Sequence, residues 1–183
     1  MRRYSDFRNA RLGDYVHRDA TAEDLAAIVA IYNATVASRQ VTADTEPVTV
    51  ASRRDWFERH TPQRRPLWVA ERGGEVIGWL SYSDFYGRPA YAATAELSIY
   101  IHPAARGQGL GRYFMTEALL NAADYGIDTL LGFIFGHNLP SLALFEAFGF
   151  ERWGNLPGVA RLDGTRRDLV IMGRGVASDE SAE

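Results

Sequence analysis

The sequence of 183 residues contains no cysteine, and all 20 of its basic residues are arginine, so it has no lysine either. The absence of cysteine excludes disulfides, thiolate metal sites and a cysteine nucleophile. The absence of lysine excludes Schiff-base chemistry and the lysine of a Walker phosphate loop. There is also little excess charge: the net charge of -3 gives no electrostatic reason to expect nucleic acid or an anionic membrane as a partner.

Long apolar runs are absent as well, since none approaches the roughly 20 residues that a membrane-spanning helix requires. The first residues contain arginine but no apolar segment typical of a signal peptide. We therefore expect a cytoplasmic protein. Its length and its 46% hydrophobic content predict one domain over 15–173, with an N-terminal extension at 1–14 and a flexible tail at 174–183.

The hydrophobic pattern predicts strands that alternate with helices. The expected elements are, in order, a strand at 15–20, helices from 21 and at 50–60, strands at 67–71, 76–83 and 93–101, a helix at 112–125, a strand at 128–135, a helix at 138–148, and strands at 150–153 and 167–172. This order predicts an α/β fold in which a mixed sheet carries helices on both faces.

A glycine-rich segment, Arg106-Gly-Gln-Gly-Leu-Gly111, lies between the strand at 93–101 and the next helix. Glycines let a backbone approach an anion closely, and the first N–H groups of a helix have no partner within the helix. The helix dipole adds about half a positive charge at that end. The segment therefore predicts a pyrophosphate site.

Two common pyrophosphate folds do not fit this segment. A dinucleotide fold carries G-x-G-x-x-G near the start of its first strand–helix–strand unit, whereas this loop lies past the middle of the chain and is one residue shorter. A Walker loop needs Gly-Lys followed by Ser or Thr, which the sequence lacks. A dinucleotide-binding protein is kept as an alternative, which NADH binding would support.

Two motifs together resemble the GNAT N-acetyltransferase superfamily. Residues 106–111 are similar to its Gln/Arg-x-x-Gly-x-Gly/Ala acyl-CoA signature, and 138–150 are similar to its second motif, an Asn followed by Leu-Phe-Glu-x-x-Gly-Phe. The resemblance covers about 15–172 and implies a central twisted mixed sheet flanked by helices. Shorter segments at 31–33, 45–47, 55–58, 95–103 and 156–159 are most similar to the phosphinothricin and methionine sulfoximine/sulfone acetyltransferases.

The resemblance implies how acetyl-CoA, the cosubstrate, would be bound. Backbone N–H groups of 107–111 would hold the pyrophosphate with Arg106 as countercharge, and Asn138 would hydrogen-bond the pantetheine. The backbone of 99–101 would pair with the pantetheine arm as an added strand does, and a strand N–H would polarise the thioester carbonyl. The implied cofactor-binding residues are Ile99, Tyr100, Ile101, Arg106, Gly107, Gln108, Gly109, Leu110, Gly111, Asn138 and Ser141.

Glu96 is the candidate general base. An ammonium has no lone pair, and amines with a pKa near 10 are mostly protonated at pH 7, so a base must remove a proton directly or through water. In an extended strand Glu96 shares a face with Ser98 and Tyr100, opposite Ala95 and Leu97. Its position also matches a glutamate of the similar subgroup. The alternative interpretation is a carboxylate at an edge or facing solvent.

The sequence departs from the family pattern in two places. Where many members have a tyrosine that protonates the departing thiolate, and the subgroup often has histidine, this chain has Phe145, which cannot donate. Water or Ser141 would then supply the proton, or a thiolate with a pKa of about 8.5 would leave unprotonated. In the C-terminal turn at 162–168, only Gly164 and Asp168 of the subgroup's pattern are retained, which weakens a specific substrate assignment.

Arg88 and Tyr91, in the loop at 84–91, are the candidate acceptor-binding residues, together with Tyr82 and Tyr86. They could bind a carboxylate or another oxyanion, and the alternative is an exposed loop. The arginine pairs at 53–54 and 64–65 are expected to be solvated or at a dimer contact. Trp56 and Phe57 are expected in the core or in an interface. The four histidines have no metal-ligand spacing, so no metal is expected.

The sequence thus predicts an acetyl-CoA-dependent N-acetyltransferase whose acceptor is the primary amine of a small amino-acid-like compound of the phosphinothricin or methionine sulfoximine/sulfone type. The amine would attack the thioester directly. Two alternatives stay open, a transferase for protein N-termini, polyamines or aminoglycosides, and a non-catalytic acyl-CoA-binding sensor. The resemblance also implies a homodimer.

Overall fold

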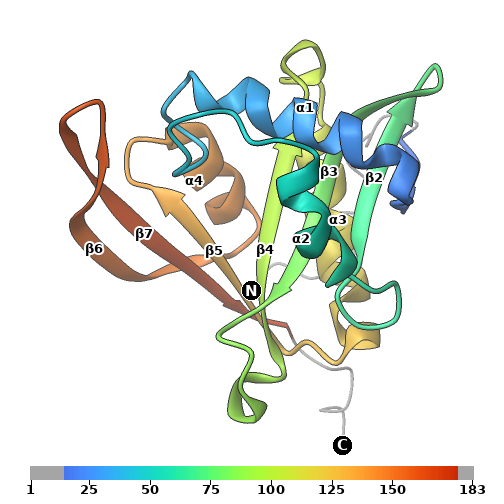
Figure 1. The fold of residues 1–183 in the computed structure, drawn as a ribbon. Helices are drawn as coiled ribbons and strands as arrows, with labels where there is room; N and C mark the ends of the chain where they lie inside the picture. The colour runs from blue at the N-terminus through green and yellow to red at the C-terminus, as the bar shows by residue number, and fades with distance from the viewer. Residues whose placement is uncertain (1–14, 177–183) are drawn as a thin grey trace, which may run out of the picture.

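The computed structural model describes residues 15–176, so the expected extension at 1–14 and residues 177–183 lie outside the described part of the chain. Within that part, seven strands form one sheet in the order β1-β2-β3-β4-β5-β7-β6 (Figure 1). The strands are β1 His17–Asp19, β2 Leu67–Arg72, β3 Glu75–Asp84, β4 Thr94–Ile101, β5 Thr129–Phe135, β6 Glu151–Leu162 and β7 Thr165–Gly175. The α-helices are α1 Leu25–Val36, α2 Arg54–Glu58, α3 Leu110–Asn121 and α4 Leu139–Ala147, and short 3-10 turns lie at Ala22–Asp24, Ala51–Arg53, Pro89–Tyr91, Pro103–Ala105 and Ala122–Tyr125.

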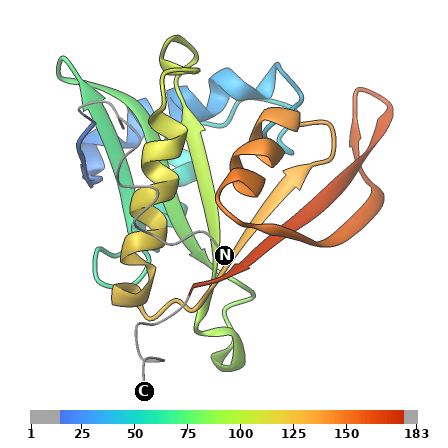
Figure 2. The ribbon, with the colours of Figure 1, turned by 180° about the vertical axis from the view of Figure 1, so that it is seen from behind.

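The sheet is mixed, because β4 and β5 run parallel whereas the other neighbouring strands run antiparallel. Helices α1 and α2 cover one face, and α3 and α4 cover the other, as the two opposite views show (Figures 1 and 2). The predicted fold class and the predicted order of strands and helices are confirmed.

The two faces of the sheet bury separate apolar layers. On β2, Trp68 and Ala70 pack in the layer under α3, which includes Phe114, whereas Leu67 and Val69 pack in the layer under α1. A strand that is buried on both faces loses the polar–apolar alternation of a surface strand. The continuous apolar run at the start of β2 follows from this position.

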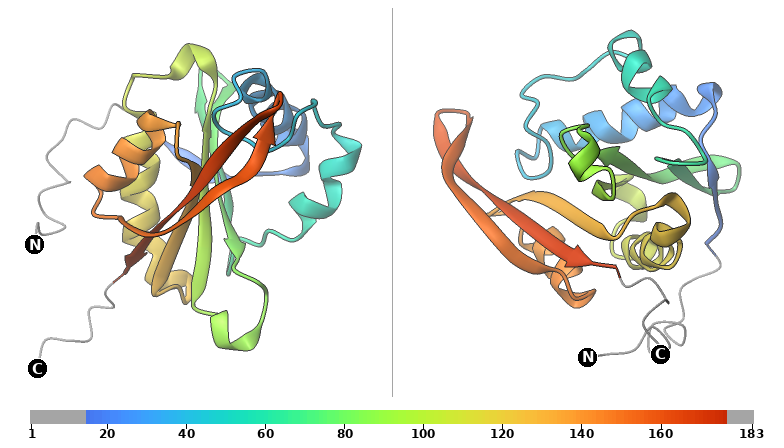
Figure 3. Two further views of the ribbon diagram at one scale, coloured as in Figure 1. Left: turned by 90° about the vertical axis from the view of Figure 1, so that its left-hand side faces the viewer. Right: turned by 90° about the horizontal axis from the view of Figure 1, so that it is seen from below.

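The C-terminal strands are longer than predicted. The expected strands at 150–153 and 167–172 overlap only parts of β6 and β7, which pair as a hairpin with arms of 12 and 11 residues (Figure 3). Asp163 and Gly164 form its turn with φ angles of 48° and 80°, which is the geometry that an Asp-Gly turn favours. The prediction of a tail from 174 is wrong at its start, since β7 continues through Gly175 and Val176 is buried.

β4 and β5 separate soon after they meet. They pair only at Thr94–Thr129, Ala95–Leu130 and Glu96–Leu131. Beyond Glu96, β4 continues to pair with β3, and β5 continues to pair with β7. The two strands therefore diverge in the shape of a V (Figure 1). We call the space between them beyond the Glu96–Leu131 pair the opening, so Glu96 marks its closed end. Each strand bordering the opening has one edge of backbone groups without a neighbouring strand.

Arg65 joins the segments at the closed end of this opening. Its side chain is 4% exposed, so the prediction of a solvated or dimer-contact residue is wrong. The guanidinium donates to Asp84 Oδ1 at 2.8 Å and to the carbonyl oxygens of Ala92 at 2.6 Å and Tyr125 at 3.3 Å. These bonds connect the end of β3 with the segments that precede β4 and β5.

Replacing Arg65 with Gln is expected to lower the free energy of unfolding by about 2 kcal/mol, because buried carbonyl oxygens lose their donor. Arg64→Gln is the matched control, since Arg64 also contacts Asp84 at 2.8 Å but has a side chain that is 51% exposed. Its loss is expected to cost less than about 1 kcal/mol. Urea unfolding of both variants measures the difference, and equal losses would contradict this role for Arg65.

Candidate functional site

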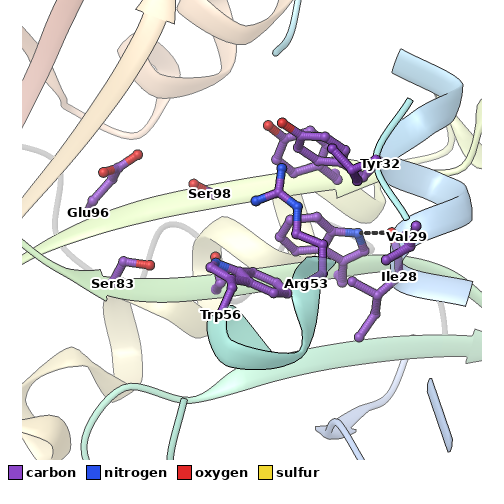
Figure 4. Close-up of a pocket in the computed structure, with 12 residues that line it drawn as sticks. Ile28, Val29, Tyr32, Arg53, Trp56, Ser83, Glu96 and Ser98 are labelled. Carbon is purple, nitrogen blue, oxygen red and sulfur yellow. Dashed lines mark hydrogen bonds between the residues drawn. The ribbon is translucent and has the colours of Figure 1, made fainter. Parts of the chain in front are cut away.

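A cavity of about 250 Å³ lies between the sheet and helices α1 and α2, next to the closed end of the opening between β4 and β5 (Figure 4). Its floor consists of three cross-strand pairs of β3 and β4, namely Ser83 with Glu96, Ser81 with Ser98, and Trp79 with Tyr100. Side chains two residues apart on a strand share a face. The predicted common face of Glu96, Ser98 and Tyr100 is therefore confirmed.

The roof of the cavity comes from segments that are distant in the sequence. Helix α1 contributes Ile28, Val29 and Tyr32, and the segment around α2 contributes Arg53 and Trp56. Val48, from the loop between them, completes the roof. Tyr32 follows Val29 by three positions and Ile28 by four, and Trp56 follows Arg53 by three, which places the residues of each segment on one side of a helix.

The end of the cavity at Glu96 is polar and has unused hydrogen-bonding capacity. Neither the carboxylate of Glu96 nor the hydroxyls of Ser81, Ser83 and Ser98 form a side-chain hydrogen bond with any residue between 15 and 176. Burial raises the pKa of the Glu96 carboxyl, because the ionised form loses hydration that no partner replaces. A carboxylate in this environment is a stronger base than one on the surface.

The other end of the cavity is aromatic. Trp79 stacks on Tyr100 with ring centroids 4.4 Å apart, and Trp56 meets Trp79 edge-on at 5.5 Å. The indole of Trp79 donates to the carbonyl oxygen of Ile28 at 3.1 Å, which fixes the strand against α1 (Figure 4). Burial raises the pKa of the Tyr100 hydroxyl, so this residue remains a neutral phenol at physiological pH.

Arg53 reaches the cavity from above and is held by two residues. Its Nη2 donates to Asp44 Oδ2 at 2.8 Å, and its guanidinium carbon lies 4.6 Å from the centre of the Tyr32 ring. The Tyr32 hydroxyl donates to the same Asp44 oxygen at 2.5 Å and also contacts Thr42. A cation above an aromatic face and beside a carboxylate has a restricted orientation.

The glycine loop lies beyond the open end of β4. Gly107 and Gly109 have φ angles of 71° and 92°, which glycine adopts without strain, and Gly109 precedes the first turn of α3. None of the backbone N–H groups of 107–112 donates to another residue of the described range 15–176. A row of free donors at a helix N-terminus is suited to an anion.

The remaining predicted cofactor residues surround this loop. Arg106 is exposed, and its Nε donates to the carbonyl oxygen of Ile101 at 3.3 Å. The side chain of Gln108 donates to the Ala104 carbonyl at 2.7 Å and accepts from Arg72 at 2.8 Å, so it stabilises the loop. The backbone of 99–101 borders the opening, although the Tyr100 side chain belongs to the cavity.

Asn138 and Ser141 lie at the start of α4, beyond the end of β5. Asn138 is buried, and its Oδ1 accepts from the Ser141 backbone N–H at 3.3 Å as a helix cap. Phe145, on the same helix, is buried with its ring against Gly132 and 4.7 Å from the ring of Phe150. Phe145 is therefore a core residue with no proton to donate.

The structure does not place every predicted acceptor ligand at the cavity. Arg88 and Tyr91 are exposed and are not among the lining residues, and Tyr91 instead meets Phe85 at 5.4 Å. Tyr82 is fully buried on the opposite face, where its hydroxyl donates to the Ala118 carbonyl at 2.9 Å, so the prediction for this residue is wrong. The binding roles of Arg88 and Tyr91 stay predictions.

Several residues that line the cavity were not predicted from the sequence. Arg53 was expected to be solvated or at a dimer contact, yet it lines the cavity. Trp56 packs against the core layer under α1, in agreement with the prediction, and also lines the cavity. Ser81 and Ser83 could have been found, because the alternation of β3 places them opposite Tyr82.

Within residues 15–176 there is no group of three or more His, Asp or Glu side chains suited to a metal, and no helix is long and apolar enough to span a membrane.

Comparison with known proteins assigns the chain to a family. Residues 28–150 match the family model described as the acetyltransferase (GNAT) family. The chain is 58% identical to YwnH of Bacillus subtilis, provisionally named a phosphinothricin acetyltransferase, over 86% of this chain and 96% of that protein. It is 34% identical to an L-methionine sulfoximine/L-methionine sulfone acetyltransferase of Pseudomonas aeruginosa, over 85% and 91% of the two chains. The structure of a phosphinothricin acetyltransferase from Sinorhizobium meliloti in complex with AcCoA matches with a TM-score of 0.85 and 31% identity, over 93% of both chains.

Proposed function

The chain belongs to the acetyltransferase (GNAT) family, and we propose that it transfers the acetyl group of acetyl-CoA to the primary amine of a small amino-acid-like acceptor. The observation that carries this proposal is the opening between β4 and β5. It leads from the glycine loop at one end to Glu96 and the cavity at the other. Two substrates that enter from opposite sides of the sheet would therefore meet beside Glu96.

Acetyl-CoA fits the opening by its chemistry. The free N–H groups of 107–111 would hold the pyrophosphate, and Arg106 would add a countercharge. The pantetheine arm carries amide groups, which can pair with the free edge of Leu97–Ile101 as an added strand does. A backbone N–H of the same edge would polarise the thioester carbonyl. Asn138 and Ser141 would border the arm from the β5 side.

The reaction then needs two protons removed from the acceptor nitrogen, one before and one after the attack, and one charge stabilised. Glu96 would accept a proton from the ammonium of the acceptor, directly or through a water held by the nearby serine hydroxyls. The neutral amine attacks the thioester carbon and a C–N bond forms. The C–S bond then breaks with its electron pair staying on sulfur, and the nitrogen releases its second proton to water. Because Phe145 has no hydroxyl, CoA would leave as a thiolate or take its proton from water or Ser141.

The acceptor is proposed from the relatives together with the cavity. The named relatives are acetyltransferases for phosphinothricin, methionine sulfoximine and methionine sulfone. The cavity of about 250 Å³ suits a molecule of that size, with polar groups at one end and aromatic rings at the other. The homodimer and the cytoplasmic location stay predictions.

The test is release of CoA thiol from acetyl-CoA over a panel of amines. The panel contains phosphinothricin, methionine sulfoximine, methionine sulfone, a polyamine, an aminoglycoside and a peptide. The protein contains no cysteine, so the thiol signal comes from CoA alone. We expect release with the amino-acid analogues. Release with the polyamine, the aminoglycoside or the peptide alone would assign the enzyme to that class of acceptor. Binding of acetyl-CoA without release of thiol from any amine would favour a non-catalytic acyl-CoA-binding sensor.

A further inference from the structure

The cavity contains two charged side chains of opposite sign. Of the twelve residues that line it, Glu96 is the one with an acidic side chain and Arg53 is the one with a basic side chain. The other ten have uncharged side chains. They come from opposite walls, since Glu96 lies on the floor in β4 and Arg53 lies in the roof beside α2. Figure 4 shows the guanidinium end of Arg53 extending into the cavity on the side of Ser98 and Glu96.

An α-amino acid at neutral pH carries the same two charges, with its ammonium and carboxylate on one carbon atom. We propose that Arg53 binds the carboxylate of the acceptor and thereby directs its amino group to Glu96. The inference rests on the proposed function and adds the residue that would select amino acids over other amines. Polyamines and aminoglycosides carry no carboxylate and would leave Arg53 without its ligand.

Arg53 has the donors that this role requires. Its Nη2 is engaged by Asp44, whereas Nε and Nη1 form no hydrogen bond with a residue of the described chain. The side chain is 26% exposed and lies against the Tyr32 ring, so water competes for its donors less than at the surface. A guanidinium with free N–H groups in such a place favours a carboxylate as its partner.

Asp44 and Tyr32 act as positioning residues for Arg53. Asp44 Oδ2 receives both the guanidinium and the Tyr32 hydroxyl, so its charge is divided between two donors. Asp44 lies in the loop between α1 and α2. Asn33 holds this loop against α1, because its amide exchanges two hydrogen bonds of 2.9 Å with the backbone of Val48. The loop therefore holds the Arg53 side chain above the floor.

The proposal differs from the sequence prediction, which assigned an acceptor carboxylate to Arg88. Arg88 is exposed in the loop before β4 and does not line the cavity. Arg54, next to Arg53, is also exposed and is not a lining residue. Arg54 gives the matched control, because it has the same charge and differs from Arg53 in its position, and Arg88 gives the competing assignment of the carboxylate.

The test compares L-methionine sulfone with its carboxamide, which keeps the amine and removes the negative charge. The readout is the ratio of kcat/KM for the acid to that for the amide, measured for the wild type and for Arg53→Gln, Arg54→Gln and Arg88→Gln. Comparing the ratio between variants cancels the different reactivity of the two amines. Loss of a charge-assisted hydrogen bond predicts that Arg53→Gln lowers the ratio about 30-fold. The ratio should be unchanged in Arg54→Gln.

The outcomes separate the inference from the proposed function. An unchanged ratio in Arg53→Gln would overturn the inference, and a fall in Arg88→Gln instead would assign the carboxylate to Arg88. A wild type that acetylates neither compound but acetylates polyamines would overturn the proposed acceptor class and the inference with it. The KM for acetyl-CoA, unchanged in Arg53→Gln, shows that this variant is folded.

Discussion

Replacing Glu96 with Gln is expected to lower kcat by about 100-fold or more, because a positioned general base contributes roughly 10² to 10⁴ in rate. The substitution keeps the size and the polarity of the side chain and removes its ability to accept a proton. The KM for acetyl-CoA should not change, since Glu96 lies at the closed end of the opening, away from the glycine loop. Steady-state kinetics with the best acceptor of the panel measures both quantities.

The pH dependence gives a second signature of Glu96. Burial raises the pKa of its carboxyl, so the carboxylate forms at a higher pH than in an ordinary glutamate. The rate of the wild type should therefore fall on the acid side with an apparent pKa above the usual glutamate range. Glu96→Asp keeps a carboxylate and should keep this acid limb at a lower rate, whereas Glu96→Gln should lose it.

The burial of Glu96 that favours catalysis should lower the stability of the folded protein at neutral pH. Because the pKa of Glu96 is higher in the folded than in the unfolded protein, folding favours the protonated form. This contribution is complete below the unfolded pKa and is lost as the pH rises through the folded pKa. Glu96→Gln should therefore have a higher Tm than the wild type at pH 7, and the difference should vanish near pH 4. A lower Tm at pH 7 would contradict this account.

The residues that sequence patterns located are those whose role depends on local geometry. The alternation of β4 was enough to place Glu96 with Ser98 on one face, because a strand repeats every two residues. The glycines before α3 were recognisable because positive φ angles and free helix N–H groups are local properties. The family motifs agreed with both, and the fold followed from the order of the elements.

The roof of the cavity could not be predicted in this way. Tyr32 and Arg53 are 21 positions apart, and their contact depends on how the loop between α1 and α2 folds around Asp44. An arginine or a tryptophan on a short helix has the same local pattern whether it faces solvent, core or a cavity. The burial of Arg65 was hidden for the same reason, since its acceptors lie on three separate segments.

The prediction for Tyr82 was wrong for a different reason, because the alternation of its own strand is enough to place its side chain. Tyr82 was grouped with the loop at 84–91, whereas β3 continues to Asp84 and fixes the direction of each side chain. Tyr82 belongs to the same face as Leu80, which is the face buried under α3. Its neighbours Ser81 and Ser83 lie on the cavity face. A shift of one residue along a strand thus separates core from site.

Gly109→Val is expected to weaken acetyl-CoA binding about 100-fold, because a β-branched residue does not tolerate a φ of 92° and the backbone must turn its N–H groups away from the anion. Losing two charge-assisted hydrogen bonds of about 1.5 kcal/mol each accounts for that factor. The measurement is the stabilisation by acetyl-CoA. At 100 times the wild-type Kd, the wild type gains about 2.7 kcal/mol and the variant about 0.4 kcal/mol.

Gly74→Val separates this effect from backbone strain. Gly74, in the turn between β2 and β3, has a φ of 82°, and an added Cβ there meets no atom within 4 Å, as at Gly109. Both variants should therefore lose similar stability without ligand, since both force a side chain into the left-handed region. If the glycine loop holds the pyrophosphate through its backbone, Gly74→Val keeps the full stabilisation by acetyl-CoA. An equal loss of that stabilisation in both variants would assign the effect to strain, and the anion would then be bound elsewhere.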